Sequence, residues 1–153
     1  MRPYVLLLAV LPLLGCPSSD QSVADSAASE SATETTTIGN MAGGWTVRAM
    51  PEQGDTTLLT YTVNATSDTT GWTVTFPGRE PMPVRVLAVD ADSVVLEIGP
   101  YESVLRPNVQ VVTQSVSRIV GDRLVGTAVA RYRGTGVGAD SVVRLRLEGT
   151  RAP

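Results

Sequence analysis

Few side chains in this 153-residue chain could carry out chemistry, and several common kinds are missing. The chain has no histidine, all 12 of its basic residues are arginine, and its single cysteine is Cys16. It can therefore form neither a Ser-His-Asp triad nor a lysine Schiff base, and a lone cysteine cannot form an intramolecular disulfide. The chemistry that remains is that of carboxylates, of tyrosine, or of a metal ion held by oxygen ligands.

Two groups of carboxylates are candidates for such chemistry. Glu97 and Glu102 flank Gly99-Pro100, and a pair of carboxylates is what a glycosidase uses. Asp90 and Asp92 could offer oxygen ligands to calcium, but a hairpin turn between two apolar runs favours Asp as well. A third acid is missing beside the aspartates, and a turn between the glutamates would leave both in water. We therefore predict no metal, no cofactor and no enzymatic activity.

Aromatic and arginine side chains that could recognise a ligand are concentrated in a few places. Residues 101–106 mix aromatic, charged and hydroxyl side chains, and Tyr and Arg are common recognition residues. We predict a ligand-binding set of Trp72, Tyr101, Arg106 and Tyr132. The alternative for 101–106 is an edge strand that is guarded by charge and bounded by prolines.

The N-terminal residues MRPYVLLLAVLPLLGC have the pattern of an export signal. The apolar run after Arg2 is much shorter than the roughly 20 residues of a membrane-spanning helix. Leu13-Leu14-Gly15-Cys16 resembles the bacterial lipobox, which implies cleavage before Cys16 and attachment of lipid to it. We expect a signal peptide at 1–15 and a lipid-anchored protein of the bacterial cell envelope; the alternative is an ordinary secretory peptide followed by an incidental cysteine. Pro17 occupies the position at which an inner-membrane retention signal carries Asp. The sequence therefore leaves open whether the protein is anchored in the inner or the outer membrane.

Residues 16–40 are predicted to be a disordered linker. They consist mainly of Ser, Thr, Ala and acids, which offer too little apolar surface to offset the entropy of ordering the backbone. Four of the chain's 15 acids and none of its arginines fall in this segment. The net charge of −3 argues against a nucleic-acid partner, because phosphate contacts require clustered cations.

From Met41 onward the pattern is β throughout, with Val and Thr in short runs and Gly, Pro and Asp between them. Strands are predicted near 44–50, 56–65, 71–76, 83–90, 93–98, 101–105, 109–120, 123–133 and 140–149. Tight turns between short strands indicate one domain over 41–153, an antiparallel meander of about eight strands. Such a meander closes as a barrel or packs as a β-sandwich.

The faces of the last two predicted strands differ in character. In 140–149, the apolar residues Val143, Leu145 and Leu147 alternate with charged residues. This alternation predicts a strand with one face toward the interior and the other toward solvent. In 123–133, one face carries Leu124, Gly126, Ala128, Ala130 and Tyr132. Small residues there either leave room inside a barrel or let a neighbouring sheet approach closely, and the barrel interior is either a packed core or a ligand cavity.

Gly43-Gly44-Trp45 resembles the Gly-x-Trp that opens the first strand of lipocalin-like proteins of the calycin group. The resemblance implies a barrel over 43–151 in which the Trp packs across one end beneath an arginine of the last strand. Arg144 and Arg146 are the candidates for that arginine, followed by Arg151. It also implies non-catalytic binding of a small apolar molecule.

The tetrad Gly-Trp-Thr-Val occurs at 44–47 and again at 71–74, with one predicted strand between the two copies. In an up-and-down meander, the two tetrads then enter the barrel from the same end. We expect Trp45 to be a structural plug there and Trp72 to contact ligand.

Together these patterns predict a lipid-anchored envelope protein that binds a small hydrophobic molecule or lipid in the barrel or at its rim. The alternative is an interaction or inhibitor module of the envelope, with a filled core and a protein partner. In either case the lipid on Cys16 is the predicted contact with the membrane.

Overall fold

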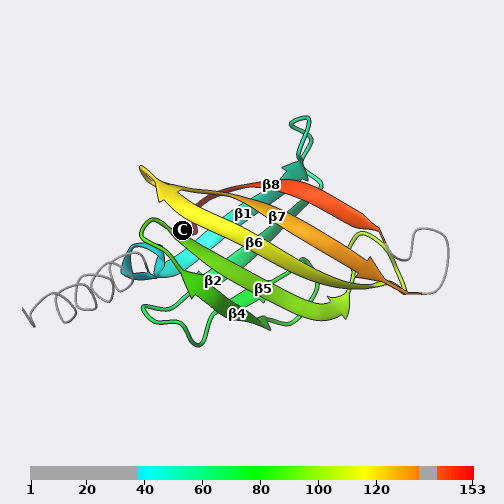
Figure 1. The fold of residues 1–153 in the computed structure, drawn as a ribbon, viewed down its shortest axis with the longest axis horizontal. Helices are drawn as coiled ribbons and strands as arrows, with labels where there is room; N and C mark the ends of the chain where they lie inside the picture. The colour runs from blue at the N-terminus through cyan, green and yellow to red at the C-terminus, as the bar shows by residue number, and fades with distance from the viewer. Residues whose placement is uncertain (1–37, 135–140) are drawn as a thin grey trace, which may run out of the picture.

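The computed structural model describes residues 38–134 and 141–153, which form an all-β domain (Figure 1). Val and Thr dominate its strands, as expected for half-buried pleated surfaces. The strands are β1 Gly43–Pro51, β2 Leu59–Ala65, β3 Thr73–Thr75, β4 Met82–Val89, β5 Ser93–Glu102, β6 Gln110–Val120, β7 Arg123–Arg133 and β8 Val142–Arg151. The predicted signal peptide, Cys16 and most of the predicted linker lie outside the described residues.

The strands form a closed antiparallel barrel. Each strand pairs with the next along the chain, and β8 returns to pair with β1, so that Trp45 lies opposite Arg151. The predicted meander is confirmed, and its two ends meet in a barrel and not in a sandwich. Of the segment 101–106, for which an edge strand is the alternative, only Tyr101 and Glu102 are strand residues. They pair with β6, whereas the pairing of β5 with β4 ends at Ile98, and residues 103–106 belong to the β5–β6 loop.

β5 is the strand that differs most from the prediction. The two strands expected at 93–98 and 101–105 are one strand that continues through Gly99-Pro100 to Glu102. Its pairing with β6 shifts between Ile98 and Tyr101. Because of this shift, Ile98 and Tyr101 both line the interior, although an odd spacing would place them on opposite faces of a regular strand.

The two ends of the barrel are covered differently. At one, the helix end, a helical turn at 38–41 lies beside the start of β1 and buries Ile38 and Met41 in the core (Figure 1). Residues 38–40, which we assigned to the linker, therefore belong to the folded domain. The other, the loop end, carries the β1–β2, β3–β4 and β5–β6 connections, the end of β7 and the start of β8.

The small residues of β7 serve two purposes. A Cβ on Gly126 would lie 2.4 Å from the carbonyl oxygen of Val116, so glycine at this position lets β6 approach closely. Ala128 and Ala130, in contrast, line a cavity at the loop end. The small residues of β7 thus make room for β6 at Gly126 and for the cavity at Ala128 and Ala130, at different heights in the barrel.

Candidate functional site

Two small spaces lie inside the barrel, one toward each end. The helix-end space has a volume of about 20 Å³ and is lined by both tryptophans and Met41. The loop-end cavity has a volume of about 50 Å³ and is lined by aromatic and aliphatic side chains. The cavity is the candidate site, because the helix-end space has room for about one water molecule.

Trp45 is the plug of the helix end. Its side chain is 1 % exposed, and its indole N–H donates a hydrogen bond of 2.8 Å to the carbonyl oxygen of Met41. The guanidinium carbon of Arg151 lies 4.0 Å from the centre of the indole ring, which is a cation–π contact. Arg151 also donates hydrogen bonds to the carbonyls of Asn40 and Ala42 and so ties the helical turn to β8.

The arginine over Trp45 is therefore Arg151, and our placement of Arg144 or Arg146 there is wrong. β8 runs toward the helix end, so only its last residues reach the start of β1. Arg146 lies nearer the middle of β8 on the outer face, where it pairs with Asp55 at 2.6 Å. Arg144 is also exposed on that face, opposite Val129 of β7.

Trp72 lies at the same end as Trp45, as the strand directions predicted. It is 2 % exposed, and its indole N–H donates to the carbonyl oxygen of Asp68 at 2.8 Å. The Asp68 carboxylate accepts hydrogen bonds from the N–H and the hydroxyl of Thr70, which order the preceding loop. Trp72 belongs to the core and lines the helix-end space, not the loop-end cavity, and its ligand contact stays a prediction.

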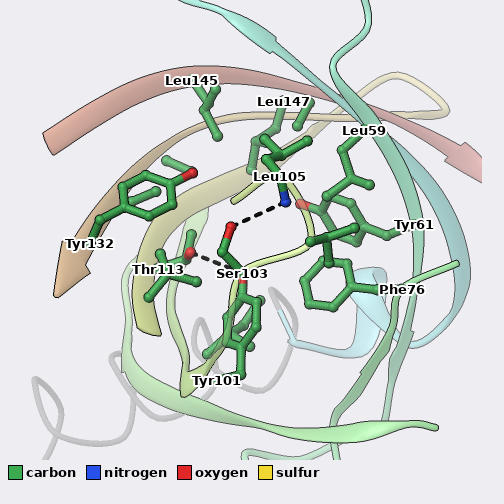
Figure 2. Close-up of a pocket in the computed structure, with 16 residues that line it drawn as sticks. Leu59, Tyr61, Phe76, Tyr101, Ser103, Leu105, Thr113, Tyr132, Leu145 and Leu147 are labelled. Carbon is green, nitrogen blue, oxygen red and sulfur yellow. Dashed lines mark hydrogen bonds between the residues drawn. The ribbon is translucent and has the colours of Figure 1, made fainter. Parts of the chain in front are cut away.

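The loop-end cavity brings two predicted ligand-binding residues together. Tyr101 of β5 and Tyr132 of β7 both line it, and Figure 2 shows Tyr132 across the cavity from Tyr61 and Phe76. The Phe76 ring stacks on Tyr101, with ring centres 5.1 Å apart. The cavity is closed by aliphatic residues of β2, β6 and β8 and by the β5–β6 loop.

The β5–β6 loop is a well-bonded cover over this cavity. The Ser103 hydroxyl accepts hydrogen bonds from the backbone N–H groups of Leu105 and Arg106, at 3.1 and 3.0 Å. The Ser103 N–H donates to the carbonyl oxygen of Val109 at 2.7 Å, which closes the loop on itself. Arg79 of the β3–β4 connection holds the loop from outside by donating to the carbonyl of Ser103 at 3.3 Å.

Arg106, the fourth predicted ligand-binding residue, contacts the cavity wall from the outside. Its guanidinium carbon lies 4.2 Å from the centre of the Tyr132 ring, and it donates a hydrogen bond to the Ser141 hydroxyl. Arg106 therefore joins the loop to β7 and β8, beside the cavity and not within it.

Tyr61 and Phe76 are site residues that we missed. Tyr61 alternates with outward-facing threonines in the run Thr60-Tyr61-Thr62, so the period of two already indicated that it points inward. Phe76 follows Val74 by two positions and carries the same signal. Along the sequence, both residues are distant from the segment 101–106, which contains Tyr101 and Arg106.

The cavity is electrically neutral at ordinary pH. Burial raises the pKa of Tyr61 above its usual value, and the neighbouring Tyr101 raises it further. Burial also raises the pKa of Tyr101, whose hydroxyl lies 3.3 Å from that of Thr113. Both phenols therefore stay protonated in the folded barrel well above neutrality.

The free energy of unfolding is expected to fall as the pH rises above about 10. The unfolded chain releases both tyrosine protons near the unperturbed pKa of 10.0, whereas the folded barrel retains them. Stability that is fully present below pH 10 is thus lost as the pH rises toward the folded-state pKa, by about 1.4 kcal/mol per pH unit for Tyr61, and Tyr101 adds to the loss in the same direction. Urea unfolding between about pH 9 and 11 measures this slope. Tyr61→Phe should reduce this slope by the contribution of Tyr61. Equal slopes in the variant and the wild type would contradict the raised pKa of Tyr61.

The carboxylates that invited a catalytic interpretation do not share a site. Glu97 is held on the outer face by Arg85 and by the Gln114 amide at 2.9 Å. Glu102 lies at the end of β5 and accepts a hydrogen bond from the N–H of Asn108 at 3.2 Å. Within 38–134 and 141–153, no cluster of three metal-binding side chains occurs, and no helix is long and apolar enough to cross a membrane.

Comparison with known protein families, with curated proteins and with solved structures gives no match for this chain. The barrel is observed directly, whereas the likeness to lipocalin-like proteins stays a prediction from the short Gly-x-Trp motif.

Proposed function

We propose that this protein is a non-catalytic binding protein of the bacterial cell envelope, anchored by lipid on Cys16. In this proposal it takes the apolar part of a small hydrophobic molecule into the loop-end cavity. The observation that supports binding is the composition of that cavity, in which four aromatic rings surround a neutral, mostly apolar interior. Concave apolar sites with a few polar groups are where small molecules usually bind.

Three of the hydroxyls that line the cavity already have partners. The hydroxyls of Tyr101 and Thr113 form a hydrogen bond with each other, and the Ser103 hydroxyl accepts a hydrogen bond from the backbone N–H of Leu105. An apolar group that enters would therefore displace no essential hydrogen bond, and its gain would come from removing its own surface from water.

Binding is tested with an environment-sensitive dye that carries a butyl tail, a length for which the 50 Å³ cavity has room, and with a variant that fills the cavity. The wild-type protein should show saturable dye fluorescence, and Ala130→Leu should weaken dye binding at least tenfold. Ala130 is 3 % exposed and lines the cavity, so a larger side chain there occupies the binding space.

Thr127→Leu is the matched control, since Thr127 is on the same strand but exposed on the outer face. Its dye affinity should equal that of the wild type, and thermal unfolding should show that both variants remain folded. Equal dye binding by Ala130→Leu and Thr127→Leu, or no saturable binding at all, would overturn the proposed function.

A second candidate, an interaction or inhibitor module, is favoured by the small volume of the cavity and by exposed apolar residues on the outer face of the barrel. Val116 and Val142 are 45 % and 58 % exposed on β6 and β8. This module would show no saturable dye uptake and would form a stable complex with an envelope protein that Val116→Glu disrupts.

A further inference from the structure

A groove on the outer surface lies beside the seam between β2 and β3, with a volume of about 410 Å³. The two strands pair at only three positions, of which Thr62 opposite Thr75 is the last toward the loop end. After Thr75 the chain turns away through residues 76–80. The groove occupies the space between this turn and β2.

The groove and the loop-end cavity share part of their walls. Tyr61 and Phe76 line both spaces. Their ring centres are 5.4 Å apart and the ring planes are inclined at 58°, so they contact each other across the seam. Figure 2 shows both rings on the same wall of the cavity. At this height the two spaces are thus separated by two side chains and not by a hydrogen-bonded pair of strands.

We propose that the groove and the cavity together bind a single-chain amphiphile with an uncharged polyhydroxyl head. The head lies in the groove, and the apolar end passes between Tyr61 and Phe76 into the cavity. This inference rests on the proposed function, because the cavity must accept an apolar group.

The lining of the groove selects the class of head group. Thr60, Thr62 and Thr75 line it, and their hydroxyls can both donate to and accept from sugar or glycerol hydroxyls. Arg79 and Glu80 line it with opposite charges. Arg79 already donates hydrogen bonds to the carbonyls of Glu102 and Ser103. An anionic head group would therefore be repelled by the Glu80 carboxylate without an arginine dedicated to neutralising it.

The cavity volume sets the length of the apolar end. A water-sized group needs about 10–15 Å³, so the 50 Å³ cavity has room for about three to five carbon atoms. Affinity should rise about fourfold for each methylene up to a chain of about five carbons, and then level off, because further carbons stay in water.

Calorimetric titration of the purified protein with ethyl, butyl, hexyl and octyl glucoside tests this class of ligand. Alkyl carboxylates of equal chain length are the anionic comparison and should bind at least tenfold more weakly. The double variant Thr62→Val with Thr75→Val keeps the shape of the groove and removes two hydroxyls. It should weaken glucoside binding about tenfold and leave binding of the lipophilic dye unchanged.

The matched control is Thr127→Val with Thr150→Val, which removes two hydroxyls from the outer face of β7 and β8, outside the groove. Its glucoside affinity should equal that of the wild type. If the dye binds but the glucosides bind no better than the carboxylates, or if the groove variant keeps full glucoside affinity, this inference is wrong and the proposed function stands. If the dye does not bind, the proposed function fails and this inference fails with it.

Discussion

Replacing Trp45 with alanine is expected to lower the free energy of unfolding by about 3–5 kcal/mol. The indole is almost completely buried, and its removal would leave a space beside Met41 at the helix end. The Met41 carbonyl would lose its indole donor, and Arg151 would lose the ring that it covers. Urea unfolding, followed by the fluorescence of the remaining tryptophan, measures the loss.

Two arginines of β8 provide the comparison for this prediction. Arg151→Gln should cost about 1–2 kcal/mol, because it removes a cation–π contact and the hydrogen bonds to the carbonyls of Asn40 and Ala42. Arg144→Gln should change stability by less than about 0.5 kcal/mol, since Arg144 is an exposed residue of the same strand. A larger loss in Arg144→Gln than in Arg151→Gln would contradict the observed packing of the helix end.

Trp72→Ala is expected to destabilise the barrel by about 3–5 kcal/mol as well, and to leave dye binding at the loop end intact. The Trp72 side chain is almost completely buried, and its indole N–H donates a hydrogen bond to the loop that carries Asp68. It lines the helix-end space and not the loop-end cavity. The measurement combines urea unfolding with dye titration under conditions in which the variant remains folded.

This result separates a structural role for Trp72 from the ligand contact that its sequence position suggested. Trp72→Phe is the milder variant, which keeps an aromatic ring and loses the hydrogen bond to the Asp68 carbonyl. It should show an intermediate loss of stability and normal dye binding. A large loss of dye affinity with little loss of stability would restore the ligand role and move the binding site to the helix end.

Much of the barrel was predictable from local patterns. Gly, Pro and Asp marked the turns, and the alternation in β8 showed which of its residues face inward. The directions of successive strands correctly placed Trp45 and Trp72 at one end. These predictions depend on neighbours in the chain, for which a period of two and turn chemistry are sufficient.

The site was only partly predictable. Tyr101 and Tyr132 were selected as recognition residues and do meet in one cavity. Arg106 lies beside that cavity, and Trp72 is at the opposite end. Tyr61 and Phe76, which form its remaining aromatic wall, come from short strands with no conspicuous charge or motif.

The sequence by itself determined the class of the domain, the face on which most strand residues lie, and the absence of histidine, of lysine and of an intramolecular disulfide. The tertiary structure alone decided the height of each residue along the barrel. It placed Arg151 over Trp45, brought Ile98 and Tyr101 to the same interior, and joined Tyr61 to Phe76 across the seam. The physical reason is that side-chain alternation specifies a face, whereas height depends on the register between strands, and register is set by pairing, bulges and closure of the whole barrel.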